Sequence, residues 1–282
     1  MMQGLWEPIR QETWMQTALD HIDRQEPFLL SGAGDSVQNH LIAACLGFTG
    51  RKAVVITANE MKAKEVFEEL SFYAPKTCYF FPAKDPLFYS ADVRGLAIEE
   101  ERMKVFEALR QEKAQIVVLS IEALYDRLLP KTVWESFIIR RRIGDELPQE
   151  TLVPRLIQMG YERCEQVESR GQFAVRGGII DIYPVTGDIA YRIELWGDEI
   201  DSIRVLDTET QRSAQRLEYL TIWPVAEIVL GDEQIQRGTE CIQSQLKSGM
   251  ESLLAEGLKE EAERLQEITS ALLERLESRR LR

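Results

Sequence analysis

Residues 172–204 read QFAVRGGIIDIYPVTGDIAYRIELWGDEIDSIR, and this stretch decides the fold of the middle of the chain. Apolar residues alternate with polar ones on both sides of Gly177-Gly178, a pattern that predicts two antiparallel strands joined by a tight turn. The alternation continues to the end of the stretch and predicts further strands of the same sheet. Four charged side chains are set into these strands: Arg176, Asp181, Arg192 and Glu194. Such side chains form either the solvated face of a half-buried sheet or a flat recognition surface.

The same part of the chain resembles a domain of bacterial repair proteins. The matching residues, in chain order, are Gly160-Tyr161-Glu162-Arg163, Arg170-Gly171, Phe173, Val175-Arg176-Gly177, Ile180-Asp181-Ile182-Tyr183-Pro184, Arg192-Ile193-Glu194, Gly197-Asp198-Glu199-Ile200 and Ser202-Ile203. They resemble the small inserted domain shared by the nucleotide-excision-repair protein UvrB and the transcription-repair coupling factor (Mfd). The resemblance implies a domain that docks onto UvrA, which periodicity alone does not show.

The composition is typical of a soluble globular protein. The chain has 282 residues, of which 44% are hydrophobic and 29% charged, enough for two modest domains with cores. No apolar run approaches the roughly 20 residues that span a bilayer, and the N-terminus lacks the features of a signal peptide. The four cysteines lie far apart and form no CxxC pair. We therefore expect reduced structural thiols in the cytoplasm, with no metal, no cofactor and no membrane contact.

The charge pattern favours a protein partner over nucleic acid. The formal net charge is −13, and affinity for phosphates comes largely from Lys and Arg. No lysine occurs between Lys131 and Lys247, whereas twelve arginines do. Arginine presents a planar fork that suits carboxylates at protein interfaces, although a compositional bias explains the same pattern.

Residues 1–135 alternate helix and strand patterns. Helices are predicted over Glu12–Arg24, Val37–Leu46, Glu60–Tyr73, Leu96–Glu112 and Ile121–Leu129. Short apolar runs between them predict buried parallel strands at Phe28–Leu30, Ala53–Thr57, Cys78–Phe81 and Ile116–Leu119. This order predicts an α/β fold with a parallel sheet covered by helices. The resemblance implies that this sheet belongs to a RecA-like, helicase-type domain.

The pattern changes twice after that, which predicts three parts. Residues 1–136 are the first part of the RecA-like domain, and residues 137–228 are an inserted α+β domain whose one helix, over Gln149–Met159, follows Pro148. Residues 229–282 are a helical return segment, divided by Gly257. A solvated helical hairpin is the favoured interpretation of that segment, and a partner-binding coiled coil is the alternative. The abrupt end RRLR suggests that the chain is a fragment of a longer protein.

The place where a RecA-like domain binds ATP lacks the required residues. A phosphate loop needs G-x-x-x-x-G-K-[ST], whose backbone amides and lysine hold the phosphates. Here Gly32 and Gly34 are followed by Asp35, whose negative charge suits a helix start better than a phosphate. We expect this loop to be degenerate, with no nucleotide binding and no catalytic residues. The segment 81–90 is also shorter than the aromatic hairpin with which UvrB clamps DNA, and both departures favour the coupling factor.

The resemblance also implies which side chains grip UvrA. The matching positions are Arg163, Arg176, Arg192 and Glu194, while the UvrB pattern has a further arginine where this chain has Ala174. Tyr183 matches a position where an aromatic anchors the interface, or else it is a core aromatic before a turn. Arg170 is an adjacent candidate. A few central, desolvated arginines can dominate such an interface.

Together these features predict the non-catalytic N-terminal recruitment module of a bacterial transcription-repair coupling factor. The parent protein is expected to be an ATP-dependent DNA translocase that engages RNA polymerase and DNA through its other parts. Its C-terminal domain is expected to cover the UvrA-binding face at rest. The alternative is a UvrB-type ATP-dependent helicase subunit, which the loop at Gly32–Asp35 disfavours. A DNA-binding module is disfavoured by the acidic composition.

Overall fold

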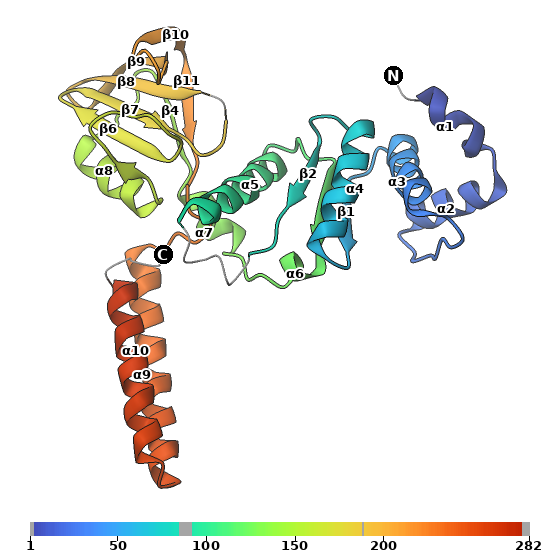
Figure 1. The fold of residues 1–282 in the computed structure, drawn as a ribbon. Helices are drawn as coiled ribbons and strands as arrows, with labels where there is room; N and C mark the ends of the chain where they lie inside the picture. The colour runs from blue at the N-terminus through green and yellow to red at the C-terminus, as the bar shows by residue number, and fades with distance from the viewer. Residues whose placement is uncertain (1–2, 85–91, 188, 278–282) are drawn as a thin grey trace. The chain divides into compact units, whose positions relative to one another are not determined.

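A computed structural model describes residues 3–84, 92–187 and 189–277 (Figure 1). The chain divides into two compact units, residues 1–127 and residues 128–282, and each is described by itself. The region 85–91, which includes most of the segment proposed to replace the aromatic hairpin, lies outside the described residues. No helix within the described ranges has the length and apolar character needed to cross a bilayer.

The first unit is built on a three-stranded parallel sheet. Strands β1 (Ala53–Thr57), β2 (Cys78–Phe81) and β3 (Ile116–Ser120) are ordered β1-β3-β2, and both pairings are parallel. The helices of this unit are α1 (Gln3–Arg10), α2 (Thr13–Arg24), α3 (Asp35–Thr49), α4 (Glu60–Tyr73), α5 (Asp92–Arg110) and α6 (Ile121–Leu124). The expectation of an α/β fold with a parallel sheet is therefore confirmed.

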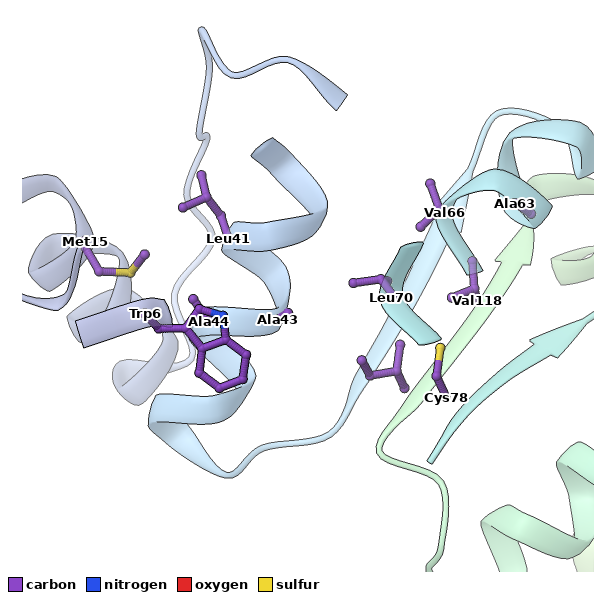
Figure 2. Close-up of a cluster of buried hydrophobic side chains, with 11 residues drawn as sticks. Trp6, Met15, Leu41, Ala43, Ala44, Ala63, Val66, Leu70, Cys78 and Val118 are labelled. Carbon is purple, nitrogen blue, oxygen red and sulfur yellow. The ribbon is translucent and has the colours of Figure 1, made fainter. Parts of the chain in front are cut away.

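Helix α4 links the sheet to the N-terminal helices. It contacts all three strands on one side and α3 on the other. Figure 2 shows the resulting cluster, in which Leu70 and Val118 are fully buried and Trp6 reaches in from α1. Asn59 caps α4 by accepting a hydrogen bond from the Lys62 amide at 2.9 Å, which explains why this helix begins where the sequence predicts.

Three predictions for this unit need correction. No strand forms at Phe28–Leu30, where Leu29 is 89% exposed and the Phe28 ring stacks on His21 of α2 with ring centroids 5.8 Å apart. Three apolar residues after a proline, which lacks an amide donor, are too little to hold a strand in the sheet. The helix predicted over Ile121–Leu129 ends at Leu124. Strand β1 forms as predicted but is not buried on both faces.

The second unit contains a six-stranded sheet, ordered β10-β9-β8-β7-β6-β5. All its pairings are antiparallel except that of β5 with β6. Its strands are β5 (Glu162–Arg163), β6 (Gln172–Arg176), β7 (Ile179–Tyr183), β8 (Ala190–Trp196), β9 (Glu199–Leu206) and β10 (Ser213–Leu217). Strands β4 (Ile139–Arg142) and β11 (Tyr219–Ile222) form a separate antiparallel pair, and the helices before and between them are α7 (Lys131–Ser136) and α8 (Gln149–Gln158).

The turn at Gly177-Gly178 is confirmed. Arg176 pairs with Ile179 across a two-residue loop, and Gly177 has a φ of 61°, which glycine adopts at little cost. The predicted helical hairpin is also confirmed. Helices α9 (Asp232–Ala255) and α10 (Lys259–Glu277) pack against each other, with Gly257 in the turn at a φ of 82° (Figure 1). The final residues 278–282, including RRLR, lie outside the described part of the chain.

Candidate partner-binding face

The six-stranded sheet has one apolar side and one side on which charged residues lie next to a small buried cluster. Side chains alternate between the two sides along each strand, and paired residues on neighbouring strands share a side. The apolar side includes the fully buried residues Phe173, Ile180, Ile182, Ile193 and Ile203, together with the half-buried Val175 and Tyr191. The strand residues between these therefore point to the opposite side.

That opposite side carries the charged residues that the sequence singles out. Asp181 pairs with Ala174 on β6 and with Arg192 on β8, and Arg192 pairs with Arg204 on β9. Eight residues on this side of β6–β10 are called the arginine face below: Arg176, Ile179, Asp181, Arg192, Glu194, Trp196, Arg204 and Arg216.

Asp181 is the centre of an ion-pair cluster. Its side chain is completely buried, and its two carboxylate oxygens accept hydrogen bonds from Nε and Nη2 of Arg192 at 2.7 and 2.8 Å. Arg176 Nη2 lies 2.5 Å from the same carboxylate. The hydrogen bonds that Arg192 donates to Asp181 raise the pKa of the Arg192 guanidinium above its ordinary value. The two arginines therefore compensate the Asp181 charge, since a buried charge is tolerated only when it is paired.

The two arginines of this cluster differ in exposure. The side chain of Arg176 is 46% exposed, whereas that of Arg192 is 13% exposed and also donates to the Gln211 carbonyl at 3.1 Å. Arg176 can therefore reach a partner, while Arg192 is largely committed to its own sheet. Glu194 is half-buried and accepts a hydrogen bond from Ser202 Oγ at 2.7 Å.

Tyr183 and Arg170 lie together at the end of β7. Tyr183 packs against a small buried cluster of Val167, Ala174, Ala190 and Leu206. The Arg170 guanidinium lies over the Tyr183 ring at 5.5 Å and donates to the carbonyls of Val185 and Gly187 at 3.1 and 2.5 Å. Ala174, the position at which the UvrB pattern has a further arginine, is also part of this buried cluster.

Arg163 is not brought together with the other candidates. It pairs with Phe173 in the short strand β5, and Phe173 belongs to the buried apolar side of the sheet. Register therefore assigns Arg163 to the side opposite the arginine face. Its side chain is exposed at the edge of the sheet.

The loop at Gly32–Asp35 begins α3. Gly32 has a φ of 87°, and Gly34 is the residue that precedes the helix. Asp35 occupies the first turn of α3, where its carboxylate accepts from Lys62 Nζ at 2.6 Å. The prediction that Asp35 caps the helix is wrong, because Gly34 is the N-cap, but the Asp35 carboxylate does lie in the first turn of α3. Within the described residues no group of His, Cys, Asp and Glu could hold a metal ion.

The sequence analysis did not single out Trp196, Arg204 or Arg216 of the arginine face. Trp196 is 85% exposed, and alternation along β8 places it on the same side as Arg192 and Glu194. Arg204 is 41% exposed, and its Nε lies 4.0 Å from Glu194 Oε1. The alternation of β8 could have revealed Trp196, but Arg204 required the register of β8 with β9, which a bulge after Glu194 shifts.

Comparison with known proteins shows which families this part of the chain is similar to. Residues 139–227 match the family described as the UvrB interaction domain. The chain is 32% identical over 233 residues to the transcription-repair-coupling factor of Bacillus subtilis (strain 168), covering 82% of this chain and 20% of that protein. It is 30% identical to the transcription-repair-coupling factor of Staphylococcus haemolyticus (strain JCSC1435), covering 83% of this chain and 20% of that protein.

A second kind of relative matches at similar identity. The UvrABC system protein B of Thermosipho africanus (strain TCF52B) is 31% identical over 256 residues, covering 85% of this chain and 38% of that protein. The chain thus spans about a fifth of the length of the coupling factors and under two fifths of the UvrB protein. Over more than four fifths of its length, the chain is therefore similar to parts of the transcription-repair-coupling factors and of UvrABC system protein B, and its residues 139–227 match the UvrB interaction domain.

Proposed function

We propose that this chain is a non-catalytic recruitment module that binds UvrA through its inserted domain. The observation that carries the proposal is the coincidence of two features on the same residues. The UvrB interaction domain over 139–227 contains the whole six-stranded sheet, and one side of that sheet is the arginine face. Arginines that are partly exposed and held by a buried carboxylate suit a partner surface that carries carboxylates.

The proposed contacts are Arg176, Arg192 and Glu194, with Tyr183 and Arg170 at one end of the same sheet and Arg163 at its edge. Arg176 is the central contact because its guanidinium is half exposed. Arg192 contributes mainly by holding Asp181 and the sheet surface in place. Arg163 reaches a partner only if that partner also covers the sheet edge.

The proposed parts of the chain are a degenerate RecA-like domain over 1–136, the inserted domain over 137–228 and a helical return segment over 229–282. In the parent protein, we propose, the remaining parts form an ATP-dependent DNA translocase that engages stalled RNA polymerase. The C-terminal domain of the parent covers the UvrA-binding face until the motor has engaged. Repair is thereby directed to sites where transcription has stopped, and the module acts in the cytoplasm.

The absence of catalysis rests on the loop at Gly32–Asp35. A nucleotide phosphate placed at the start of α3 would meet the Asp35 carboxylate, and Lys62 is already paired with Asp35 and Glu65. Like charges at that position oppose phosphate binding. Calorimetry with millimolar Mg-ATP should show no binding to the chain, whereas saturable binding would contradict this part of the proposal.

A UvrB-type helicase subunit is the second candidate, because UvrABC system protein B matches the chain at an identity close to that of the coupling factors. The same loop separates the two functions, since a helicase needs the phosphate contacts that Asp35 replaces. DNA-stimulated ATP hydrolysis by the purified chain would support the helicase and overturn the recruitment module.

Co-purification with UvrA tests the recruitment proposal itself. A tagged chain should retain UvrA on a column at moderate salt and should retain none when the inserted domain is deleted. Retention that survives the deletion would move the binding site to another part of the chain.

A further inference from the structure

Three arginines stand in a row across the arginine face. Arg192 on β8 is directly opposite Arg204 on β9, and Arg204 is directly opposite Arg216 on β10. Like charges directly opposite each other in a sheet are destabilising. The row therefore costs folding free energy unless other groups compensate it.

Among the described residues, the three arginines of the row are compensated to different degrees. The Asp181 carboxylate meets Arg192 through two short hydrogen bonds. The Nε of Arg204 is shielded from solvent, lies 4.0 Å from Glu194 Oε1 and has no hydrogen-bond partner among the described residues. Arg216 donates to the Asp201 carbonyl at 3.4 Å, a long contact. Among the described residues, Arg204 thus has only the long ion pair with Glu194, and Arg216 has a carbonyl oxygen but no carboxylate as its partner.

Apolar side chains are also exposed on the side of the sheet that carries the row. Trp196 is 85% exposed at the end of β8, and Ile179 is exposed on β7. Tryptophan and arginine are the residues most enriched among those that dominate protein interfaces. An exposed indole on the same side of the sheet as these weakly paired guanidinium groups is a combination that folding does not require and that protein interfaces use.

We propose that Trp196 and Arg204 are central contacts of the UvrA interface, which extends across β8 and β9 to Arg216. This inference rests on the proposed function and adds residues that the resemblance does not supply. The matching partner surface carries a carboxylate opposite Arg204 and an apolar recess that takes the Trp196 indole.

A protein surface fits this face better than nucleic acid. Glu194 lies between Arg176 and Arg204 on the arginine face and would repel a phosphate backbone. The chain carries a net charge of −13, and no lysine lies between Lys131 and Lys247. Nucleic-acid affinity depends on an excess of such cations.

The test is a titration of UvrA with the full chain and with Arg204→Ala and Trp196→Ala variants. Each variant should bind at least about tenfold more weakly, as expected for residues central to an interface. The melting temperature of Arg204→Ala should be unchanged or raised, because the substitution relieves like-charge repulsion. Loss of binding without loss of stability is an outcome that a merely structural role does not produce. Arg142→Ala and Tyr219→Ala, which remove an exposed arginine and an exposed tyrosine from the separate β4–β11 pair, should bind within twofold of the wild type.

Three results would overturn the inference. If both test variants bind like the wild type while Arg176→Ala is impaired, the interface ends at β7 and the proposed function stands. If the wild-type chain does not bind UvrA at all, the proposed function and the inference both fail. If the wild-type chain binds duplex DNA and Arg204→Ala removes that binding, the row recognises phosphate instead.

Discussion

Asp181 is the buried carboxylate that pairs with both Arg176 and Arg192. It is a buried carboxylate within an otherwise apolar run, and its two partners, Arg176 and Arg192, are exposed to different degrees. Removing one member of a buried ion pair leaves the other charge uncompensated, which costs far more than removing an exposed charge. The two arginines should therefore respond differently to the same substitution.

We predict that Arg192→Ala lowers the free energy of unfolding by about 3 kcal/mol, because the buried Asp181 carboxylate then loses both hydrogen bonds from Arg192. Arg176→Ala should lower it by less than about 1 kcal/mol, since Arg192 still holds the carboxylate and Arg176 is largely solvated. Urea denaturation of both variants measures the difference. If both variants lowered the free energy of unfolding equally, Arg192 would not be the main partner that stabilises the buried Asp181 carboxylate.

A buried thiol in the first unit gives a second prediction. Burial raises the pKa of the Cys78 thiol to about 11, whereas Cys241 is exposed on α9. Only the thiolate reacts with iodoacetamide, and its population falls about tenfold for each unit by which the pKa rises. At pH 8, Cys78 should be alkylated at least about a hundredfold more slowly than Cys241 in the same sample. Mass spectrometry of timed digests measures both rates, and comparable rates would show that the β2 edge opens readily.

At the scale of elements, the turn between β6 and β7 was predictable from the sequence, whereas the pairing of residues across neighbouring strands was not. Gly177-Gly178 between alternating strands is a strong local signal, and the turn forms as predicted. Alternation also separates buried from polar strand positions. It does not show that Asp181 is buried or that Arg204 stands opposite Arg192, because both depend on pairing between strands distant in sequence.

The predicted strand at Phe28–Leu30 failed for a related reason. A short apolar run shows neither that its side chains will be buried nor that a neighbouring strand is available for its backbone, and the side chains of Phe28–Leu30 are exposed. The runs at Cys78–Phe81 and Ile116–Leu119 form strands because they pair with each other in parallel. The residues at Phe28–Leu30 instead lie beside α2.

The two glycines of the turn should not be equivalent. A Cβ on Gly178 would lie 2.9 Å from the Leu195 carbonyl oxygen, and that backbone cannot move without breaking the β7–β8 pairing. Gly178→Ala should therefore destabilise the chain by about 1–3 kcal/mol, as overpacking does. Gly177 has open space around it and only a left-handed φ to satisfy, so Gly177→Asn should be close to neutral. Urea denaturation separates the two, and a neutral Gly178→Ala would contradict the tight contact with β8.

At the scale of the whole molecule, the inserted domain draws on residues just outside the boundaries predicted from sequence. Trp134 of α7 stacks on Trp223 with ring centroids 5.5 Å apart, and Gln158 donates to the Leu230 carbonyl at 2.7 Å. Val229 is fully buried. A fragment limited to 137–228 removes Trp134, Val229 and Leu230.

We predict that a 129–231 fragment folds alone and melts at least about 5 °C higher than a 137–228 fragment, because a loss of 1 kcal/mol lowers the melting temperature of such a domain by roughly 4–8 °C. Thermal melts followed by circular dichroism measure the melting temperatures of both fragments. As a control, Trp134→Ala in the longer fragment should move its melting temperature toward that of the shorter one. Equal melting temperatures would show that α7 and residues 229–231 add nothing to the domain.

The central claim is that the arginine face binds UvrA, and the affinity of Arg176→Ala for UvrA tests it most directly. Truncating one partner of an interfacial charge pair costs roughly 2–5 kcal/mol, so the dissociation constant should rise by at least about thirtyfold. The melting temperature should stay near that of the wild type, and Arg142→Ala should bind normally. Wild-type affinity in a folded Arg176→Ala variant would contradict the claim and place the interface on another part of the molecule.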